Sequence, residues 1–324
     1  MTQFAHRVLV TGGAGFIGSH SVELLLARGY RVRVLDNLSS GNLSNLPLQN
    51  RRLEFVKGDI RDASSVAQAM RDVSLCLHLA AQVSVVRSVE DPAASASHNI
   101  LGTLNVFHAA ASAGVERIVY ASSAAVYGIP RYLPIRETLT PSPISPYGLE
   151  KWADERYAEL LHTSQGLSSL GLRYFNVYGP RQDPQSPYAG VIARFLDTLL
   201  LGQSPRIFGD GLQTRDFIYV RDVARANVSA LETGHQGVCN VATGQRTNLL
   251  GLLETLGSLT HHPPTLQFSP ARQDDIRDSC GHTQRLEQWL GIQAEWSLED
   301  GLHALVSSTI QQQPADAITT TSHG

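Results

Sequence analysis

Short apolar runs alternate with longer amphipathic segments over the first half of the chain. Strand-like apolar runs lie at Arg7–Thr11, Arg31–Leu35, Leu53–Lys57, Leu75–Leu79, Arg117–Ala121 and Leu170–Phe175. Helical patterns lie between them, at Phe16–Arg28, 62–71, 93–113 and Tyr147–His162. Strands that alternate with helices build parallel sheets with both faces covered. The pattern therefore predicts an α/β fold with a Rossmann-type, doubly wound parallel sheet.

The alternation breaks up after Asn176. The stretch Tyr178–Pro187 holds three prolines and a glycine and is predicted to be a loop. Helical patterns return near 190–201, 248–258 and 283–290, with short strands between them. We predict a Rossmann domain over 1–175 to which later segments add strands, a smaller C-terminal lobe mainly over 176–310, and a disordered polar tail over 311–324.

Composition narrows the class of protein. The chain of 324 residues is 42% hydrophobic and 17% charged, as is ordinary for a globular protein, and its formal net charge of −3 offers no basic surplus for nucleic acid or an anionic membrane. Cys76, Cys239 and Cys280 show neither paired nor metal-like spacing, which favours reduced thiols in the cytoplasm and no metal site. No signal peptide is apparent, and no apolar run reaches the length of about 18 residues that a membrane span needs.

A glycine-rich turn follows the first strand directly. Gly12, Gly15 and Gly18 form GxxGxxG at the start of the first helix, and Asp36 ends the second strand 24 residues after Gly12. Such glycines allow a tight turn, a close approach of backbone amides to a pyrophosphate, and close packing of helix on strand. A carboxylate at Asp36 can accept both ribose hydroxyls of an adenosine and repels a 2′-phosphate. The pattern predicts a dinucleotide site that prefers NAD to NADP.

Two later strand ends extend this predicted site. Asp59 and Ile60 follow the third strand, where they can hold an adenine edge. Ala80 and Ala81 follow the fourth strand, and their small side chains let a dinucleotide lie close to the sheet.

A serine, a tyrosine and a lysine form a candidate catalytic set. Tyr147 and Lys151, in SPYGLEK, are four residues apart and so share one face of a predicted helix. Free tyrosine has a pKa of about 10, so it needs nearby positive charge to act as a base at neutral pH, and Lys151 with an oxidised nicotinamide supplies that charge. Ser122 and Ser123 follow the fifth strand, at the edge of the sheet that faces a ligand crevice.

The motifs TGGAGFIGSH, LDNLSSG, GDIRD, HLAAQ, NILGT, SSAAVYG, SPYGLEK and RYFNVYGPRQ together resemble the extended short-chain dehydrogenases/reductases. Among these, the chain is most similar to the UDP-hexose 4-epimerases, and the likeness runs from about Val8 to Leu302. The resemblance implies a tightly held NAD, a UDP-sugar substrate bound by the C-terminal lobe, and a homodimer built through a four-helix interface.

The resemblance also implies roles for individual residues. It implies catalytic roles for Ser123, Tyr147 and Lys151, with Ser122 as a close neighbour of the set. The implied cofactor positions are Gly12, Gly15, Phe16, Ile17, Gly18, Asp36, Asn37, Asp59, Ile60, Ala80, Ala81, Asn99, Tyr147, Lys151, Tyr174 and Val177. The implied nucleotide-sugar contacts are Ser123, Asn176, Arg181, Val191, Arg194, Phe208, Gln213, Arg215 and Arg272, with Ser84 and Arg87 in the loop after HLAAQ. Arginine forks suit diphosphate oxygens.

The implied reaction is inversion at C4 of a UDP-sugar through a 4-keto intermediate. Two other readings stay open. Nucleotide-sugar 4,6-dehydratases carry an Asp-Glu pair directly after the catalytic Ser/Thr, whereas Ala124 and Ala125 stand there in this chain. A non-catalytic NAD-binding sensor on the same fold often lacks the tyrosine or the lysine, and both are present here.

One position bears on the sugar. In the resembling enzymes, a residue seven positions after the diphosphate arginine lies beside the C2 substituent, and counting from Arg272 gives Ser279. Its small side chain favours interconversion of UDP-N-acetylglucosamine and UDP-N-acetylgalactosamine. UDP-glucose and UDP-galactose remain the alternative substrates.

Overall fold

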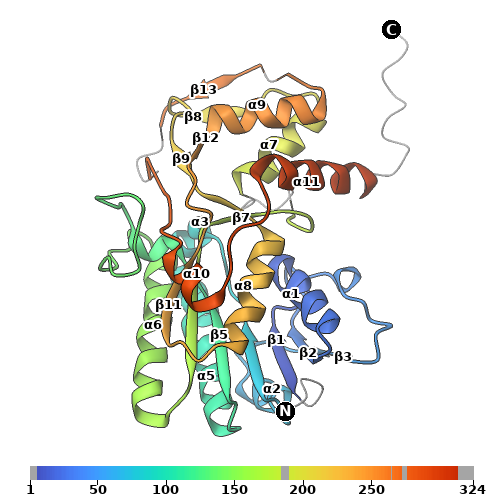
Figure 1. Cartoon of the computed structure of the whole chain (residues 1–324), viewed down its shortest axis with the longest axis vertical. Helices are drawn as coiled ribbons and strands as arrows, with labels where there is room; N and C mark the ends of the chain where they lie inside the picture. The colour runs from blue at the N-terminus through green and yellow to red at the C-terminus, as the bar shows by residue number, and fades with distance from the viewer. Residues whose placement is uncertain (1–5, 184–189, 264, 272–275, 313–324) are drawn as a thin grey trace.

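The main sheet has seven parallel strands in the order β11-β6-β5-β4-β1-β2-β3. The structure is a computed structural model, and it describes residues 6–183, 190–263, 265–271 and 276–312 (Figure 1). The strands are β1 (Arg7–Thr11), β2 (Arg31–Asp36), β3 (Leu53–Lys57), β4 (Leu75–His78), β5 (Arg117–Ser123), β6 (Ser169–Tyr174) and β11 (Gly237–Val241). The predicted fold class is confirmed. Strand order reverses between β1 and β4, and a ligand crevice is expected at that point.

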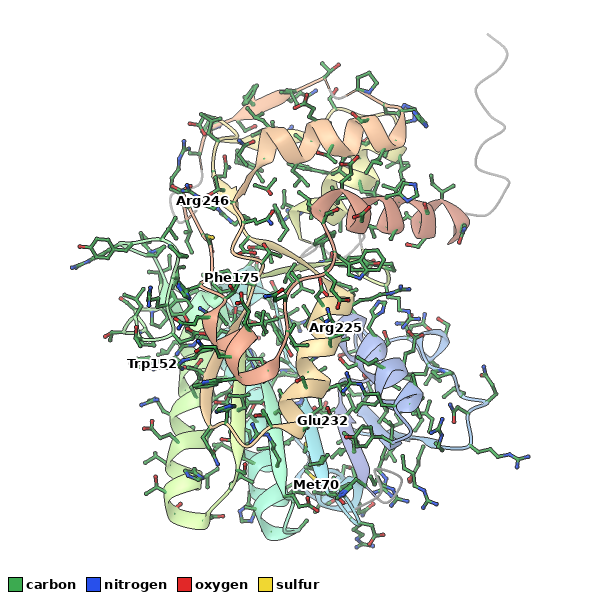
Figure 2. All side chains as sticks on the ribbon, in the orientation of Figure 1. Met70, Trp152, Phe175, Arg225, Glu232 and Arg246 are labelled. Atoms are coloured by element: carbon green, nitrogen blue, oxygen red, sulfur yellow. The ribbon has the colours of Figure 1, made fainter. Side chains whose placement is uncertain are left out.

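Helices cover both faces of the sheet. One face carries α1 (Phe16–Ala27), α8 (Val220–Glu232) and α10 (Gln284–Leu290). The other carries α2 (Ala63–Ala69), α5 (Gly102–Ser112) and α6 (Pro146–Gln165). The helix α8 is tied to α1 by Glu232, whose carboxylate accepts hydrogen bonds from Arg28 and Tyr30 (Figure 2).

The C-terminal lobe has its own apolar core. It is built from α7 (Val191–Leu200), α9 (Leu249–Thr260) and α11 (Leu298–Gln312). Three small sheets complete it: β7 (Asn176–Tyr178) with β10 (Phe217–Tyr219), β9 (Thr214–Arg215) with β12 (Thr247–Asn248), and β8 (Arg206–Phe208) with β13 (Gln267–Ser269). The lobe lies beyond the carboxyl ends of the main strands, and Phe175, just after β6, lies at the level where the two parts meet (Figures 1 and 2).

The sequence pattern assigns further strands of the Rossmann sheet to segments beyond residue 175, and β11, which the chain reaches from the lobe through α8, is such a strand. Several other elements differ from the predicted pattern. The predicted helix 93–113 is three pieces, namely α4 (Pro92–Ala96), a π-helical turn (Ser97–Leu101) and α5. A short helix, α3 (Val85–Glu90), precedes them. The helix α11 runs through Gln312, so the first two residues of the predicted tail are helical, and 313–324 lie outside the described residues.

Within the described ranges, no helix is long and apolar enough to cross a membrane. The three cysteines are buried and unpaired. No cluster of three or more His, Cys, Asp or Glu side chains suited to a metal ion occurs among the described residues.

Candidate active site

A cleft of about 420 Å³ opens at the carboxyl ends of the main strands. It brings together all the predicted catalytic residues and every predicted cofactor residue except Asn99. These lining residues are Gly12, Gly15, Phe16, Ile17, Gly18, Asp36, Asn37, Asp59, Ile60, Ala80, Ala81, Ser122, Ser123, Tyr147, Lys151, Tyr174 and Val177. Lining residues that the sequence did not single out include Val83, His98, Phe175 and Gln182.

The glycine turn has no room for side chains. A Cβ on Gly12, whose φ is +68°, would lie 2.7 Å from the backbone nitrogen of Ala80, and one on Gly18 would lie 2.1 Å from the carbonyl oxygen of Gly12. This close packing lets α1 begin at Phe16 with its first backbone N–H groups, which have no partner within the helix, at the cleft. A helix N-terminus of this kind binds phosphate, so the turn fits the pyrophosphate of a dinucleotide.

Asp36 lies at the other side of this turn. Its two carboxylate oxygens accept hydrogen bonds from the backbone N–H groups of Ala14 (2.9 Å) and Leu38 (2.8 Å). A carboxylate has about four acceptor sites, so acceptor capacity remains on the side that lines the cleft. The side chain is thus fixed in direction and fits the ribose hydroxyls of an adenosine.

Replacing Asp36 by alanine is expected to weaken NAD binding by about 1.5–3 kcal/mol, because a charge-assisted hydrogen bond to the ribose is lost. The NAD content of the purified protein and calorimetric titration measure the effect. Asp62→Ala is the matched control, since Asp62 also caps backbone, at the start of α2, but does not line the cleft. Copurification of NADP with the unaltered protein would contradict the assigned preference.

Asp59 is held as a fixed wall of the cleft. Arg61 donates to both of its oxygens and Asn37 donates to one of them at 3.0 Å. The Arg61 hydrogen bonds hold the pKa of Asp59 well below its usual range. Because its acceptor sites are used by protein groups, this carboxylate forms part of the cleft wall and offers no free acceptor there.

The two adjacent serines have different partners. Ser122 is buried and donates its hydroxyl proton to Glu155 at 2.6 Å, and Glu155 is also paired with Arg173. Ser123 accepts a hydrogen bond from the backbone N–H of Ala125 at 3.1 Å, which leaves its own proton available toward the cleft. The sequence could not separate the two, and the partner at Glu155 does.

Tyr147 and Lys151 lie in the first turns of α6. Ser145 caps this helix by accepting from the Gly148 N–H, and Pro146 occupies its first turn, so the helix start is well defined. Lys151 is almost completely buried. Burial acts to lower the pKa of Lys151, but the carboxylate of Asp154 and the nearby Tyr147 outweigh burial and raise it. The ammonium therefore stays charged beside Tyr147.

A second cavity, of about 360 Å³, lies in the C-terminal lobe. Its lining includes six of the predicted nucleotide-sugar residues: Asn176, Val191, Arg194, Phe208, Gln213 and Arg215. Asn176 lines both cavities, so the two lie next to each other at this residue. Arg206, which the sequence did not single out, brings the arginines of this lining to three. Such a cavity favours an anionic ligand with several phosphate oxygens.

Among the residues that the structure describes, five predicted site residues do not line either of these cavities. Ser84 caps α3, and Arg87 is an exposed residue of that helix. Arg181 pairs with Glu23 of α1. Asn99 and Ser279 are the other two.

Asn99 lies behind the cleft instead of in its wall. Its amide accepts from the Gln82 N–H, donates to the Gln82 carbonyl and donates to Glu150 at 2.6 Å. The π-helical turn carries this residue, and its bonds position the loop that follows β4.

Ser279 is buried, and its backbone N–H donates to the carbonyl of Thr214, in β9, at 3.1 Å. Its segment therefore lies beside β9, the strand that carries Arg215 into the lobe cavity, although Ser279 itself does not line that cavity. Arg272 lies outside the described residues.

Comparison with known proteins agrees with this geometry. The model of the NAD dependent epimerase/dehydratase family matches residues 8–242. The chain is 41% identical over 302 residues to a putative UDP-glucose 4-epimerase of Methanocaldococcus jannaschii, covering 93% of this chain and 97% of that protein.

Two solved structures are also similar. One is a UDP-glucose 4-epimerase from Thermotoga maritima with UDP-glucose, with a TM-score of 0.90 and 40% identity, covering 94% of this chain and 99% of that one. The other is a UDP-N-acetylglucosamine 4-epimerase from Methanobrevibacter ruminantium in complex with UDP-N-acetylmuramic acid. Its TM-score is 0.92 at 38% identity, covering 95% of this chain and 99% of that one.

Proposed function

Because the chain belongs to the NAD-dependent epimerase/dehydratase family, we propose that it inverts the configuration at C4 of a UDP-sugar. The observation that carries this proposal is that the two cavities are adjacent and share Asn176, which marks their junction. Ser123, Tyr147 and Lys151 line the cleft on one side of that junction, and the arginines of the lobe line the other. A UDP group in the lobe would hold the sugar at the three reactive side chains.

The chain's own residues then supply acid–base chemistry. Tyr147 acts as the phenolate, which the Lys151 ammonium stabilises, and it removes the proton from the C4 hydroxyl and becomes the neutral phenol. Ser123 holds the C4 oxygen by a hydrogen bond. Bound NAD supplies the hydride acceptor and donor at the same carbon. After the 4-keto sugar turns its other face to the site, Tyr147 returns the proton. The UDP anchor keeps the intermediate bound during that turn.

The residues after Ser123 weigh against dehydration. A 4,6-elimination needs an acid and a base near C5 and C6, and Ala124 and Ala125 supply neither. These two alanines open a short 3₁₀ turn that Ser123 caps, so the backbone here serves to fix Ser123. Epimerisation needs no further acid–base pair and is therefore the favoured reaction.

The test of the function is proton NMR of UDP-glucose, UDP-galactose and their 2-acetamido forms with purified protein and no added cofactor. Conversion of the anomeric signals of one epimer into those of the other supports the proposal. Loss of the 6-hydroxyl would identify a dehydratase. An absence of any conversion by protein that holds NAD would identify a non-catalytic binding protein.

The substrate we favour is the pair UDP-N-acetylglucosamine and UDP-N-acetylgalactosamine, because the resemblance places Ser279 beside the C2 substituent and its side chain is small. Ser279→Tyr is expected to suppress turnover of these acetamido sugars by about ten- to a hundredfold, since forcing extra atoms into a packed site costs on the order of 1–3 kcal/mol. Turnover of UDP-galactose should be spared. The measurement is kcat/KM for both sugar pairs.

Ser258→Tyr, at an exposed position of α9 in the same lobe, is the control for a new tyrosine. A native enzyme that turns over UDP-galactose far better than UDP-N-acetylgalactosamine would contradict the assigned preference.

The homodimer that we propose would pair α5 and α6 of one copy with those of another. Leu149, Tyr157 and Leu160 recur at helical spacing along α6 and are 53%, 40% and 62% exposed. Leu101, at the start of the neighbouring α5, is 50% exposed. Burying such a stripe in a four-helix bundle is favourable. The mass in solution, measured by light scattering, tests this assembly.

A further inference from the structure

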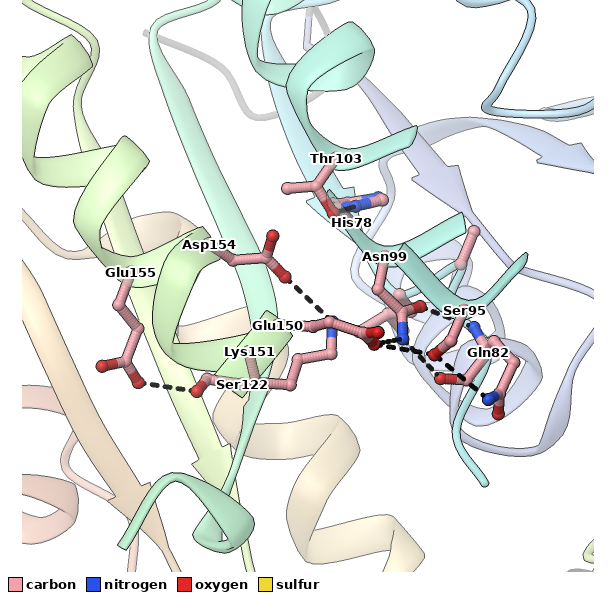
Figure 3. Close-up of polar contacts among 12 residues, drawn as sticks. His78, Gln82, Ser95, Asn99, Thr103, Ser122, Glu150, Lys151, Asp154 and Glu155 are labelled. Carbon is pink, nitrogen blue, oxygen red and sulfur yellow. Dashed lines mark hydrogen bonds and ion pairs between the residues drawn. The ribbon is translucent and has the colours of Figure 1, made fainter. Parts of the chain in front are cut away.

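Beneath the cleft, Lys151 has a buried acidic partner. Its Nζ lies 3.1 Å from Oδ2 of Asp154, one turn further along α6, and the two side chains are only 3% and 2% exposed (Figure 3). A carboxylate this close to a buried ammonium restricts where the ammonium can lie, because separating the pair would leave an uncompensated charge away from water.

Hydrogen-bonded side chains connect the sheet to Asp154. His78 of β4 is held between Thr11, at 2.7 Å, and Thr103 of α5, at 3.1 Å. Burial, with the nearby Lys151, lowers the pKa of His78 to about 3, so the ring is neutral. Thr11 accepts from the N–H groups of both Leu79 and Ala80, which uses its two lone pairs. Its hydroxyl proton therefore goes to Nδ1 of His78, and the Nε2–H of His78 goes to Thr103. The Thr103 hydroxyl is then left to donate to Asp154.

The charges around this pair come from several elements. Tyr147 and Glu150 lie on the same helix, α6, and Glu150 accepts from Ser95 and Asn99 rather than from Lys151. His78 faces the pair from β4, and Tyr120 of β5, also buried, lies near Asp154. Among the described groups, Asp154 is thus the acid that contacts the Lys151 ammonium directly.

We infer that Asp154 is a positioning residue that holds Lys151 in place and, through its negative charge, shifts the pH range in which Tyr147 gives up its proton toward higher values. The inference rests on the proposed function of Tyr147 as the base. The ammonium favours the Tyr147 phenolate, and a carboxylate paired with that ammonium opposes it. Burial itself raises the pKa of Asp154 to about 7, so the opposing charge is fully present only above neutral pH.

The test is Asp154→Asn, which keeps the shape of the side chain and removes its charge. We expect the acidic limb of the kcat/KM–pH profile to move down by about one pH unit, the size of shift that one adjacent charge causes. The same downward shift is expected in the Tyr147 titration midpoint, read as the tyrosinate absorbance that disappears in Tyr147→Phe. This spectroscopic measurement needs no turnover, so it separates failure of the inference from failure of the proposed reaction.

Glu150→Gln is the matched control, because it removes an equal buried charge next to Lys151 that does not contact the ammonium. Its shift should be less than half as large. Thr103→Val removes the donor to Asp154, and with it the acceptor of the His78 Nε2–H, but leaves the Asp154 carboxylate in place. It serves if Asp154→Asn does not fold, and it should shift both readouts down by a smaller amount. Unchanged or raised midpoints in Asp154→Asn, or in Thr103→Val where that variant is used instead, would overturn the inference. A shift in Glu150→Gln as large as that in Asp154→Asn would also overturn it.

Discussion

Tyr147→Phe is expected to reduce kcat by about a hundred- to ten-thousandfold, the contribution that a positioned acid–base group typically makes. The phenol hydroxyl acts on the C4 proton in the transition state, so its removal should leave UDP-sugar affinity nearly intact. Turnover is measured by NMR conversion of the epimer, and affinity by calorimetric titration of UDP.

Tyr132→Phe is the control for this substitution. Tyr132 is 80% exposed and does not line the cleft, so its loss should change neither quantity. Activity of Tyr147→Phe within a few-fold of the unaltered protein would show that another group is the base.

Gly18→Ala is expected to abolish retention of NAD during purification. The new Cβ would lie 2.1 Å from the Gly12 carbonyl oxygen and 2.8 Å from Cα of Gly13. Both are backbone atoms of the turn, so the turn itself must open, and the N-terminus of α1 must move away from the pyrophosphate. The strain should also lower the free energy of unfolding by about 1–3 kcal/mol.

Absorbance of the released nucleotide and thermal unfolding measure the two effects. Gly234→Ala is the matched control, since a Cβ there meets no atom within 4 Å and the backbone needs no left-handed conformation. An alanine at 18 that leaves the NAD content unchanged would mean that the turn is not the pyrophosphate site.

These substitutions test separate parts of the site. The glycine turn and Asp36 fix where a dinucleotide lies, and α6 fixes the base and the ammonium relative to it. The lobe supplies arginines on the far side of Asn176. Changes in the first part should alter cofactor content, changes in the second the chemical step, and changes in the third substrate affinity or choice.

The pattern of apolar and polar positions was enough to predict the alternation of strands and helices up to β6, and with it the fold class. It also determined the local parts of the site: the glycine turn, the acidic end of β2, and Tyr147 and Lys151 on one helix face. These features depend on residues close together in the chain, where periodicity and spacing are direct readouts of local geometry. All of those residues line the cleft. Asn99, which only the resemblance implied, does not, because its amide is hydrogen-bonded to Gln82 and Glu150.

Features that depend on contacts between distant segments could be identified only in the folded chain. The place of β11 in the sheet is one, because the sequence predicts strands from beyond residue 175 but not the strand that each pairs with, and only the folded chain sets β11 beside β6. The choice between Ser122 and Ser123 is another, since it depends on Glu155, more than 30 residues away. Lys151 and Asp154 are close in the sequence, but their burial depends on α5 and β4, which come from distant parts of the chain. Spacing predicts which side chains share a face, whereas packing alone decides which polar groups lose water and must find partners in the protein.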